Sequence, residues 1–425
     1  MVQIEDHPQR YSMANELHAR PYPIVSAPGR AAYIAIKPSQ DAAGRNRDAD
    51  REHLIALLDR FGSKHPSSGS THYFGKIGKH LLKWESHTEF LTYTVFTDTV
   101  TDQPFDPSLF AVFPADWLAA APGVRVSSAL IHVEMEENDD TIFEKSSNWF
   151  VPESLAISRV MDKQLSIAGD FRIDSSGSMR FGVFVHSEAS VRLAGRIVQQ
   201  LCEIETYKTM SMLGLDRAKG MSSKMGAIDK TLTSLLSDMV GPINKPDDVL
   251  QSLLTVSAEL ENSVAQSSFR FGATRAYESL VHERITALRE ERFQDRQTFN
   301  EFMMRRYDPA MRTVRSTQDR LARMSARAQR ASDLLRTRVD VERSAQNQEL
   351  LTSMDKRADL QLRLQRTVEG LSVVAISYYA VNLVMYVAGP LESLGITKAV
   401  IAAVATPIVL LGVWVTLKRI QKHLD

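Results

Sequence analysis

Two histidines and a glutamate near the amino terminus are the residues of this sequence best suited to chemistry. His7, Glu16 and His18 lie close together in the chain, and imidazole and carboxylate groups can share a metal ion or act as an acid/base group. Their spacing matches no stereotyped motif, so capping, ion-pair and docking roles are the alternative. The sequence contains no P-loop, Rossmann glycine fingerprint, paired-cysteine zinc site or G-x-S-x-G motif. We therefore favour a protein that is not an enzyme and has no cofactor.

A second set of residues lies inside an apolar run near the carboxyl terminus. Its members follow one another at steps of three and four, which places them on one face of a helix: Ser372, Ala375, Tyr379, Asn382, Tyr386 and Gly389. An amide such as that of Asn382 is costly against lipid, so this face should meet another helix or water. The two interpretations are packing between helices through small and hydrogen-bonding residues, or the lining of a pore. Glu392, just beyond, could attract cations.

The elements that would hold this face are two apolar segments. Residues 371–388 and 399–417 contain no charged residue, and about 18 residues of helix suffice to cross a hydrocarbon core of roughly 30 Å. Cations flank the segments on the sides away from their short connection: Lys356, Arg357, Arg363, Arg366, Lys418, Arg419 and Lys422. By the positive-inside rule, both termini then lie in the cytoplasm. We predict a transmembrane hairpin in the bacterial inner membrane, followed by a basic cytoplasmic tail at 418–425.

The segment 31–190 has the pattern of a sheet domain. Its candidate strands are rich in threonine, tyrosine and valine with partial alternation: 31–37, 72–77, 81–86, 89–96, 124–136, 165–172 and 179–185. One helix is expected at 48–61, and Asp174–Ser178 is typical of a hairpin turn. Because several strands follow one another directly, we predict an α+β domain with antiparallel pairs.

From 191 to 370 the spacing of the apolar residues becomes helical. We predict helices at 191–215 and 226–239, then two long helices separated by a turn at Pro309. The last, at 310–370, carries a heptad seam: Val314, Leu321, Ala328 and Leu335. It would reach about 90 Å, so it must pack against the preceding helix, a second copy, or both. The predicted fold class is an α+β cytoplasmic domain followed by a long α-helical or coiled-coil stalk and a two-helix transmembrane hairpin.

The overall composition argues against several classes of function. The 425 residues carry a formal net charge of zero, which gives no global attraction to nucleic acid. Arginines concentrate between 270 and 366, but without a recognition module we interpret them as the solvated flank of the stalk, and expect no nucleic-acid partner. The single cysteine, Cys202, rules out an internal disulfide and is expected to be a small buried hydrophobe. Residues 1–20 lack the apolar core of a signal peptide.

Three segments resemble an uncharacterised bacterial family. They are DHPQRYSMANELHARP within the amino-terminal segment 1–30, RIVQQLCEIETYKTMSMLGL at 196–215, and VEGLSVVAISYY at 368–379. The chain is similar along almost its whole length to domain-of-unknown-function family 3422, which is described as predicted membrane-anchored proteins. In the first segment the resemblance rests on a short set of residues: His7, Pro8, Arg10, Glu16, His18, Ala19, Arg20 and Pro21. The resemblance implies a membrane location and lends no activity.

The layout also resembles, more loosely, that of the CorA magnesium channels. Those channels join an α/β cytoplasmic domain to a long stalk helix and two carboxyl-terminal spans. The Gly-Met-Asn that closes their first span is absent, and Tyr386–Pro390 stands there instead. The sequence thus leaves three hypotheses: a membrane-anchored oligomer acting as a cytoplasmic scaffold or sensor, a cation channel or transporter, and a membrane-attached enzyme. The expected partners are the lipid bilayer, further copies of the chain, and an unknown cytoplasmic protein or ion.

Overall fold

The computed structural model describes residues 4–11, 22–40, 42–99, 101–239, 246–390 and 397–424. The chain divides into two compact units, the first comprising 1–242 and 251–330, and the second 243–250 and 331–425. The strands are β1 (Gly29–Lys37), β2 (His72–Ile77), β3 (His80–Ser86), β4 (Leu91–Thr97), β5 (Val124–Met135), β6 (Ala156–Val160), β7 (Leu165–Gly169), β8 (Met179–Val185) and β9 (Glu291–Arg292). The helices are α2 (Arg47–Arg60), the 3₁₀ helix η1 (Pro107–Val112), α3 (Ala115–Ala119), α4 (Asp139–Trp149), α5 (Val191–Asp238), α6 (Pro246–Ala287), α7 (Phe299–Val387) and α8 (Lys398–Leu424).

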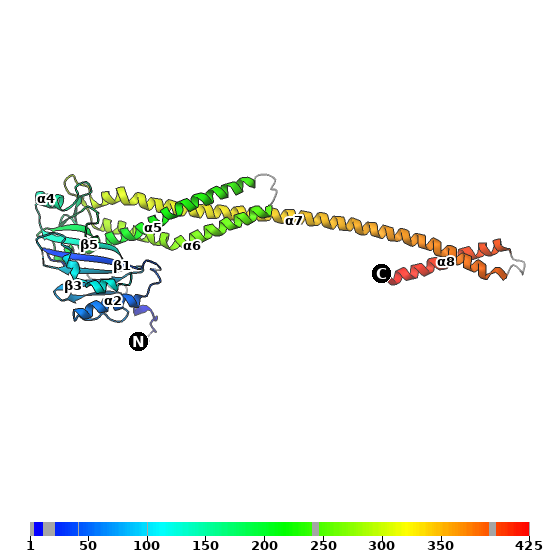
Figure 1. Cartoon of the computed structure of the whole chain (residues 1–425), viewed down its shortest axis with the longest axis horizontal. Coiled ribbons are helices and arrows are strands. Elements are labelled where there is room, and N and C mark those ends of the chain that lie inside the picture. Colours follow the sequence, from blue (N-terminus) through cyan, green and yellow to red (C-terminus); the bar gives the residue numbers. More distant parts are fainter. Residues whose placement is uncertain are drawn as a thin grey trace. The chain divides into compact units, whose positions relative to one another are not determined.

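The first unit is an α/β domain built on a mixed sheet (Figure 1). Within the described residues this sheet has nine strands in the order β2-β3-β4-β1-β5-β8-β7-β6-β9. Neighbouring strands pair antiparallel, except β5 and β8, which run parallel. The predicted turn at Asp174–Ser178 lies between the antiparallel strands β7 and β8. The sequence prediction missed β6 and β9, and β9 comes from the segment between α6 and α7.

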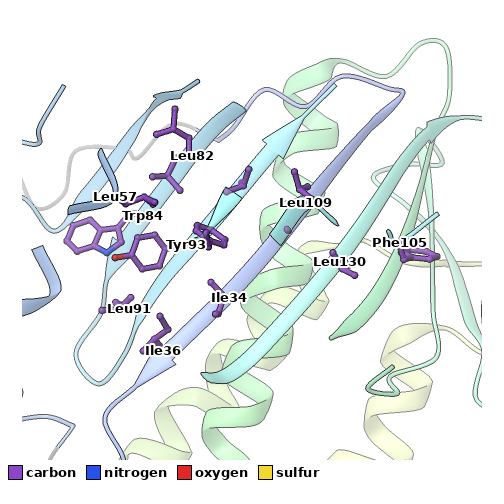
Figure 2. Close-up of a cluster of buried hydrophobic side chains, with 14 of the residues drawn as sticks. Ile34, Ile36, Leu57, Leu82, Trp84, Leu91, Tyr93, Phe105, Leu109 and Leu130 are labelled. Carbon is purple, nitrogen blue, oxygen red and sulfur yellow. The ribbon is translucent and has the colours of Figure 1, made fainter. Parts of the chain in front are cut away.

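Alternation along the strands directs side chains to two different layers. On one face, Ile34 of β1, Trp84 of β3 and Tyr93 of β4 belong to a buried core that α2 and α3 cover (Figure 2). On the other face, the Tyr33 hydroxyl lies 2.6 Å from the Thr206 hydroxyl of α5. The sheet is therefore covered on both faces, and α5 joins it to the helical part of the unit.

Three helices pack lengthwise in the first unit: α5, the part of α6 from Gln251, and α7 as far as Arg330 (Figure 1). Ser211 of α5 hydrogen-bonds to Tyr307 of α7 at 2.7 Å. Farther along both helices, an Arg320 N–H donates to Asp229 at 3.0 Å. Helices α5 and α7 therefore run parallel. Helix α6, which lies between them in the sequence, runs in the opposite direction.

The predicted heptad seam of α7 is buried within the chain. Its members are at most 2% exposed: Val314, Leu321, Ala328 and Leu335. The first three lie in the three-helix bundle of the first unit. Burial of such side chains contributes about 1.5–3 kcal/mol each for the larger ones, so this seam stabilises the bundle itself.

Two predicted helix breaks were wrong. Helix α5 is continuous from Val191 to Asp238 and includes Gly220 and Gly226, since glycine lowers helix stability by only about 1 kcal/mol relative to alanine. Pro309 lies inside α7 and marks no turn.

The break between the two long helices comes earlier, at 288–298, where Arg289 and Gln294 have positive φ. There α7 begins with a capping box: the Glu301 N–H donates to Thr298 Oγ1, and the Thr298 N–H donates back to Glu301, both at 3.1 Å. This polar signal sets the start of the helix, whereas a proline ten residues later costs a single backbone hydrogen bond.

The second unit contains the carboxyl-terminal part of α7 and all of α8. Among the described residues, these two helices are long and apolar enough to cross a membrane, α8 over Lys398–Thr416. Only 6% of the most apolar stretch of each is buried inside the chain. The apolar core helix of a soluble protein would be covered, so these helices expose apolar surface that water solvates poorly.

Candidate functional site

The amino-terminal motif is described in part. His7, Pro8 and Arg10 are exposed, and Arg10 forms an ion pair with Asp6. The other motif residues lie outside the described residues: Glu16, His18, Ala19, Arg20 and Pro21. The cluster of His7 with the second histidine and the glutamate therefore stays a prediction. Within the described part of the chain, no three His, Cys, Asp or Glu side chains are grouped to hold a metal ion.

The chain that follows this motif is packed against the start of the second family segment. The Arg196 guanidinium lies 5.6 Å from the centre of the Tyr22 ring, a cation–π distance. One residue earlier, a Cβ added to Gly195 would lie 1.7 Å from the Pro23 carbonyl oxygen. Only glycine permits this approach. The structure thus places Tyr22 and Pro23, which follow the first motif in the sequence, against the beginning of the second family segment.

A small cavity lies where α5 crosses the sheet. Its volume is about 20 Å³, enough for roughly one water molecule. Its lining comes from β1, the β3–β4 hairpin and α5: Tyr33, Lys83, Glu85, His87, Phe90, Thr92, Thr94, Phe96, Gln199, Cys202, Glu203, Thr206 and Tyr207. Lys83 and Glu85 form an ion pair at 3.0 Å. Burial raises the pKa of the Cys202 thiol, so this thiol stays protonated and inert, as the sequence predicted.

A larger, open cleft adjoins this cavity and shares three lining residues with it. Its volume is about 300 Å³, at the lower end of the range for small-molecule sites. The lining comes from α2, the β2–β3–β4 edge, α5 and α6: Arg47, Thr71, Ser86, His87, Thr88, Phe90, Tyr207, Tyr277 and Leu280. The Tyr207 and Tyr277 rings stack with centres 5.8 Å apart, and Phe90 lies within 6.4 Å of both. We call this the β3–β4 cleft.

A buried arginine holds one rim of the β3–β4 cleft in shape. Arg45, whose side chain is 4% exposed, donates to the His87 carbonyl at 2.5 Å and to the Phe90 carbonyl at 3.1 Å. The same guanidinium pairs with Asp50 at 2.9 Å. Desolvation raises the pKa of Asp50 while the charge of Arg45 opposes that rise. The turn between β3 and β4 is therefore fixed from behind by a buried charge pair.

The tip of the same turn is attached to α6. Glu89 has a side chain only 2% exposed, pairs with Arg270, and accepts a hydrogen bond from the Tyr277 hydroxyl at 3.1 Å. Burial, and then the charge of Glu89, raise the pKa of Tyr277. The sequence gives no pattern that connects these residues, because Glu89 is more than 180 positions from both Arg270 and Tyr277. The one available signal was a lone carboxylate just before an apolar strand.

Polar contacts continue from the cleft into α7. Glu278, next to Tyr277 on α6, pairs with Arg315 of α7 at 2.5 Å. Ser211 of α5 joins Tyr307 of α7, as described above, and Thr274 of α6 donates to the Ser211 carbonyl at 3.3 Å. Helices α5 and α6, which both line the cleft, therefore contact α7 directly.

The polar face predicted for the first apolar segment is exposed over most of its length. Tyr379 and Tyr386 are 72% and 85% exposed. Ala375 and Gly389 are also exposed, and Ser372 and Asn382 are half-buried. Glu392 lies outside the described residues. The buried residue of this segment is Ser377 (4%), which lies on the opposite side of the helix. That this face packs against another helix or lines a pore stays a prediction.

Comparison with known proteins identifies a family. A family model described as "Protein of unknown function (DUF3422)" matches residues 5–424. No curated protein matches the sequence. The comparisons give no support to the looser likeness to CorA channels.

Proposed function

Because the chain belongs to the DUF3422 family, whose description names no activity, we propose from its geometry that it is a membrane-anchored oligomer whose α/β domain acts as a sensor or scaffold. In this proposal the α/β domain lies in the cytoplasm and is tethered to the bacterial inner membrane. The observation that carries the proposal is the continuity of α7, one helix from Phe299 to Val387 that begins in the bundle and ends in an apolar segment.

Exposed apolar side chains support membrane insertion. Leu371, Val374 and Leu383 of α7 are 67–68% exposed, and Leu411 of α8 is 66% exposed. Removing such surface from water is worth about 25 cal/mol per Å², and a lipid bilayer is the environment that covers a two-helix segment on all sides. The flanking cations, which the positive-inside rule assigns to the cytoplasm, support the proposed orientation.

The contacts between the β3–β4 cleft and α7 support a sensing role. A ligand that moves the β3–β4 turn would act on Glu89, and through Arg270 and Tyr277 on α6. The neighbouring Glu278 carries the displacement to Arg315 of α7. Since α7 continues towards the proposed membrane segment, a change at the cleft has a direct covalent route to the bilayer. A scaffold role uses the same tether without the displacement.

Membrane insertion is tested by carbonate extraction of membranes that contain the full-length chain. The protein should stay in the membrane pellet. The double substitution Val404→Arg with Leu411→Arg should release it, because each arginine costs about 2.5–3.5 kcal/mol in the centre of a span. Leu362→Arg, in the stalk, is the matched control and should stay membrane-bound. Release of the unsubstituted protein would contradict the proposal.

Coupling is tested by hydrogen exchange of the full-length protein. Arg270→Ala should speed amide exchange in residues 299–330 of α7, because it leaves the buried Glu89 carboxylate without its cation. Arg275→Ala, an exposed position on the same helix, should leave that exchange unchanged. Equal effects of the two substitutions on α7 would argue for a scaffold without coupling.

A cation channel is the second candidate, favoured by one observation: the polar face of the first segment lies away from Ser377, the residue that is covered within the chain. In a channel this face would line the path and Asn382 would hydrate or coordinate the ion. Liposomes containing the protein should then show cation flux that Asn382→Leu reduces. Absence of flux under every ionic condition tried would remove this candidate.

A further inference from the structure

Among the described residues, none covers the middle of α7. Every residue from 340 to 368 is exposed. Among them are large apolar side chains, each at least 53% exposed: Leu350, Leu351, Met354, Leu360, Leu362, Leu364 and Val368. Monomeric soluble proteins rarely expose contiguous apolar surface on this scale.

Part of this apolar surface forms one strip that continues into the proposed membrane segment. From Leu350 the chain returns to the same side of the helix at steps of three and four, through Met354, Leu364 and Val368. The same stepping passes on, without a break, to Ala375 and the polar face of the first segment. We call this strip, from Leu350 to Gly389, the α7 seam. Two polar residues, Arg357 and Gln361, interrupt it between Met354 and Leu364, over nearly three helical turns.

The opposite side of α7 has a different character. Ser377, 4% exposed, lies two residues from Ala375 and from Tyr379, which is about 200° around the helix. Figure 1 draws α8 running back beside this end of α7. Ala405 of α8 is only 9% exposed, whereas the other described side chains of α8 are half-buried or exposed, which agrees with that packing. The side that meets α8 is therefore not the α7 seam.

Cations lie on the side of Ser377 as well. Arg366 and Arg363 precede Ser377 by eleven and fourteen residues, close to whole numbers of helical turns, and both are exposed. Lys418 and Arg419, in the last part of α8, are exposed too. Cations at this level would lie among anionic lipid headgroups. The side with α8 and the cations is thus suited to lipid, which leaves the α7 seam for a protein partner.

We propose that the α7 seam is the surface on which further copies of this chain meet, parallel and in register, with α8 on the outside. This rests on the membrane insertion proposed above. Insertion in one orientation places identical residues of all copies at the same depth, so only identical copies present a matching strip in both water and lipid. Asn382 then meets Asn382, and an amide offers both a donor and an acceptor. The polar residues Arg357 and Gln361 would fix the register, as polar positions within an apolar seam do in coiled coils.

The proposal is tested by cross-linking single cysteines in native membranes, in a Cys202→Ala background of the full-length chain. Each variant on the α7 seam has a control two residues away on the other side of the helix. The seam variants are Leu364→Cys and Ala375→Cys, and their controls are Leu362→Cys and Ser377→Cys, respectively. With an oxidant and with a short bis-maleimide, the two seam variants should form products of twice the 47.6 kDa chain mass. The two control variants should form at most a tenth as much. Val368→Cys replaces Ala375→Cys if that variant fails to reach the membrane.

Other outcomes separate the two proposals. Three cross-linking results would contradict the proposed contact at the α7 seam: an equal or greater yield at the control positions, no product at any position, or a product with a different protein. If the protein still resists carbonate extraction, the proposed membrane anchor is unaffected by these results. Release of the background protein by carbonate would overturn the membrane anchor, and the seam with it.

Discussion

Two stretches of the same helix meet different surroundings in this protein. Between Phe299 and Arg330, α7 buries its heptad seam in the bundle, and Leu321 is 2% exposed. Between 340 and 368, every residue is exposed, and Leu364 is 66% exposed. Both stretches carry leucine at helical spacing, so composition does not separate them. The first stretch is covered by its own chain, whereas the second is exposed to solvent in the single chain, which supports the association of copies proposed above.

The ion pairs differ in the same way. In the bundle they join different helices, as between Arg315 of α7 and Glu278 of α6 at 2.5 Å. In the exposed stretch the pair of Arg363 with Asp359, at 3.0 Å, lies within one helix at i, i+4 and is largely solvated. Such local pairs contribute about 0.3–0.5 kcal/mol. They favour a solvated helix but do not hold it to anything.

The largest effect should come from opening a charge pair that the first unit buries. Arg45→Ala leaves the Asp50 carboxylate, 1% exposed, without its partner and should lower the free energy of unfolding by about 3–5 kcal/mol. The exposed pair of Arg60 with Asp116 is the control, and Arg60→Ala should leave the free energy of unfolding almost unchanged. Chemical denaturation measures both. Similar costs would show that burial does not distinguish these pairs.

The comparison within α7 is tested by two leucines. Leu321→Ala should lower the free energy of unfolding by about 2–5 kcal/mol at any protein concentration, because it leaves a cavity inside one chain. Leu364→Ala should cost less than about 0.5 kcal/mol in dilute detergent, since that side chain is then solvated. Its effect should grow with protein concentration if copies associate. A concentration-independent loss with Leu364→Ala would place that residue inside its own chain.

A smaller, pH-dependent effect is expected where α7 begins. Glu290 is half-buried and accepts the Asn300 N–H at 3.0 Å, and burial raises its pKa to about 7. The raised pKa means that the fold favours the protonated carboxyl. Stability is therefore highest below the unfolded pKa, near 4.5, falls as pH rises to 7, and is level above it. Glu290→Gln should remove this slope and stabilise the protein at pH 8 by on the order of 2 kcal/mol.

Thermal unfolding between pH 5 and pH 8 measures this effect, with Glu188→Gln, an exposed position, as the control. A slope that persists in Glu290→Gln, or one that Glu188→Gln also removes, would assign the pH dependence to other groups.

The sequence predicted those parts of the fold that depend on local pattern. Alternation identified β1 and β8, and apolar spacing identified the seam through Val314 and the long helix that follows it. The short strand β9 was missed, because its two residues pair with β6 across more than 130 positions. Pro309 was misread, since the capping box at Thr298 decides where α7 starts.

The candidate site could be predicted much less well. The residues that shape the β3–β4 cleft are buried charges, such as Arg45 and Glu89, whose partners are fixed by tertiary contacts. A sequence pattern shows that a charge is present but not that it is buried. Helix periodicity alone defines the polar face around Asn382 and places Ser377 on the opposite side, while the burial of Ser377 required the structure.

Hydrogen exchange along α7, measured on the full-length protein in detergent as the protein is diluted, tests this difference between the two stretches most directly. The bundle protects residues 299–330 within one chain, so their exchange should not change on dilution. Residues 340–368 depend on association, so their exchange should speed up at least tenfold as the oligomer dissociates. If both stretches respond alike, or if 340–368 stays protected at every dilution, the two parts of α7 do not differ as we describe.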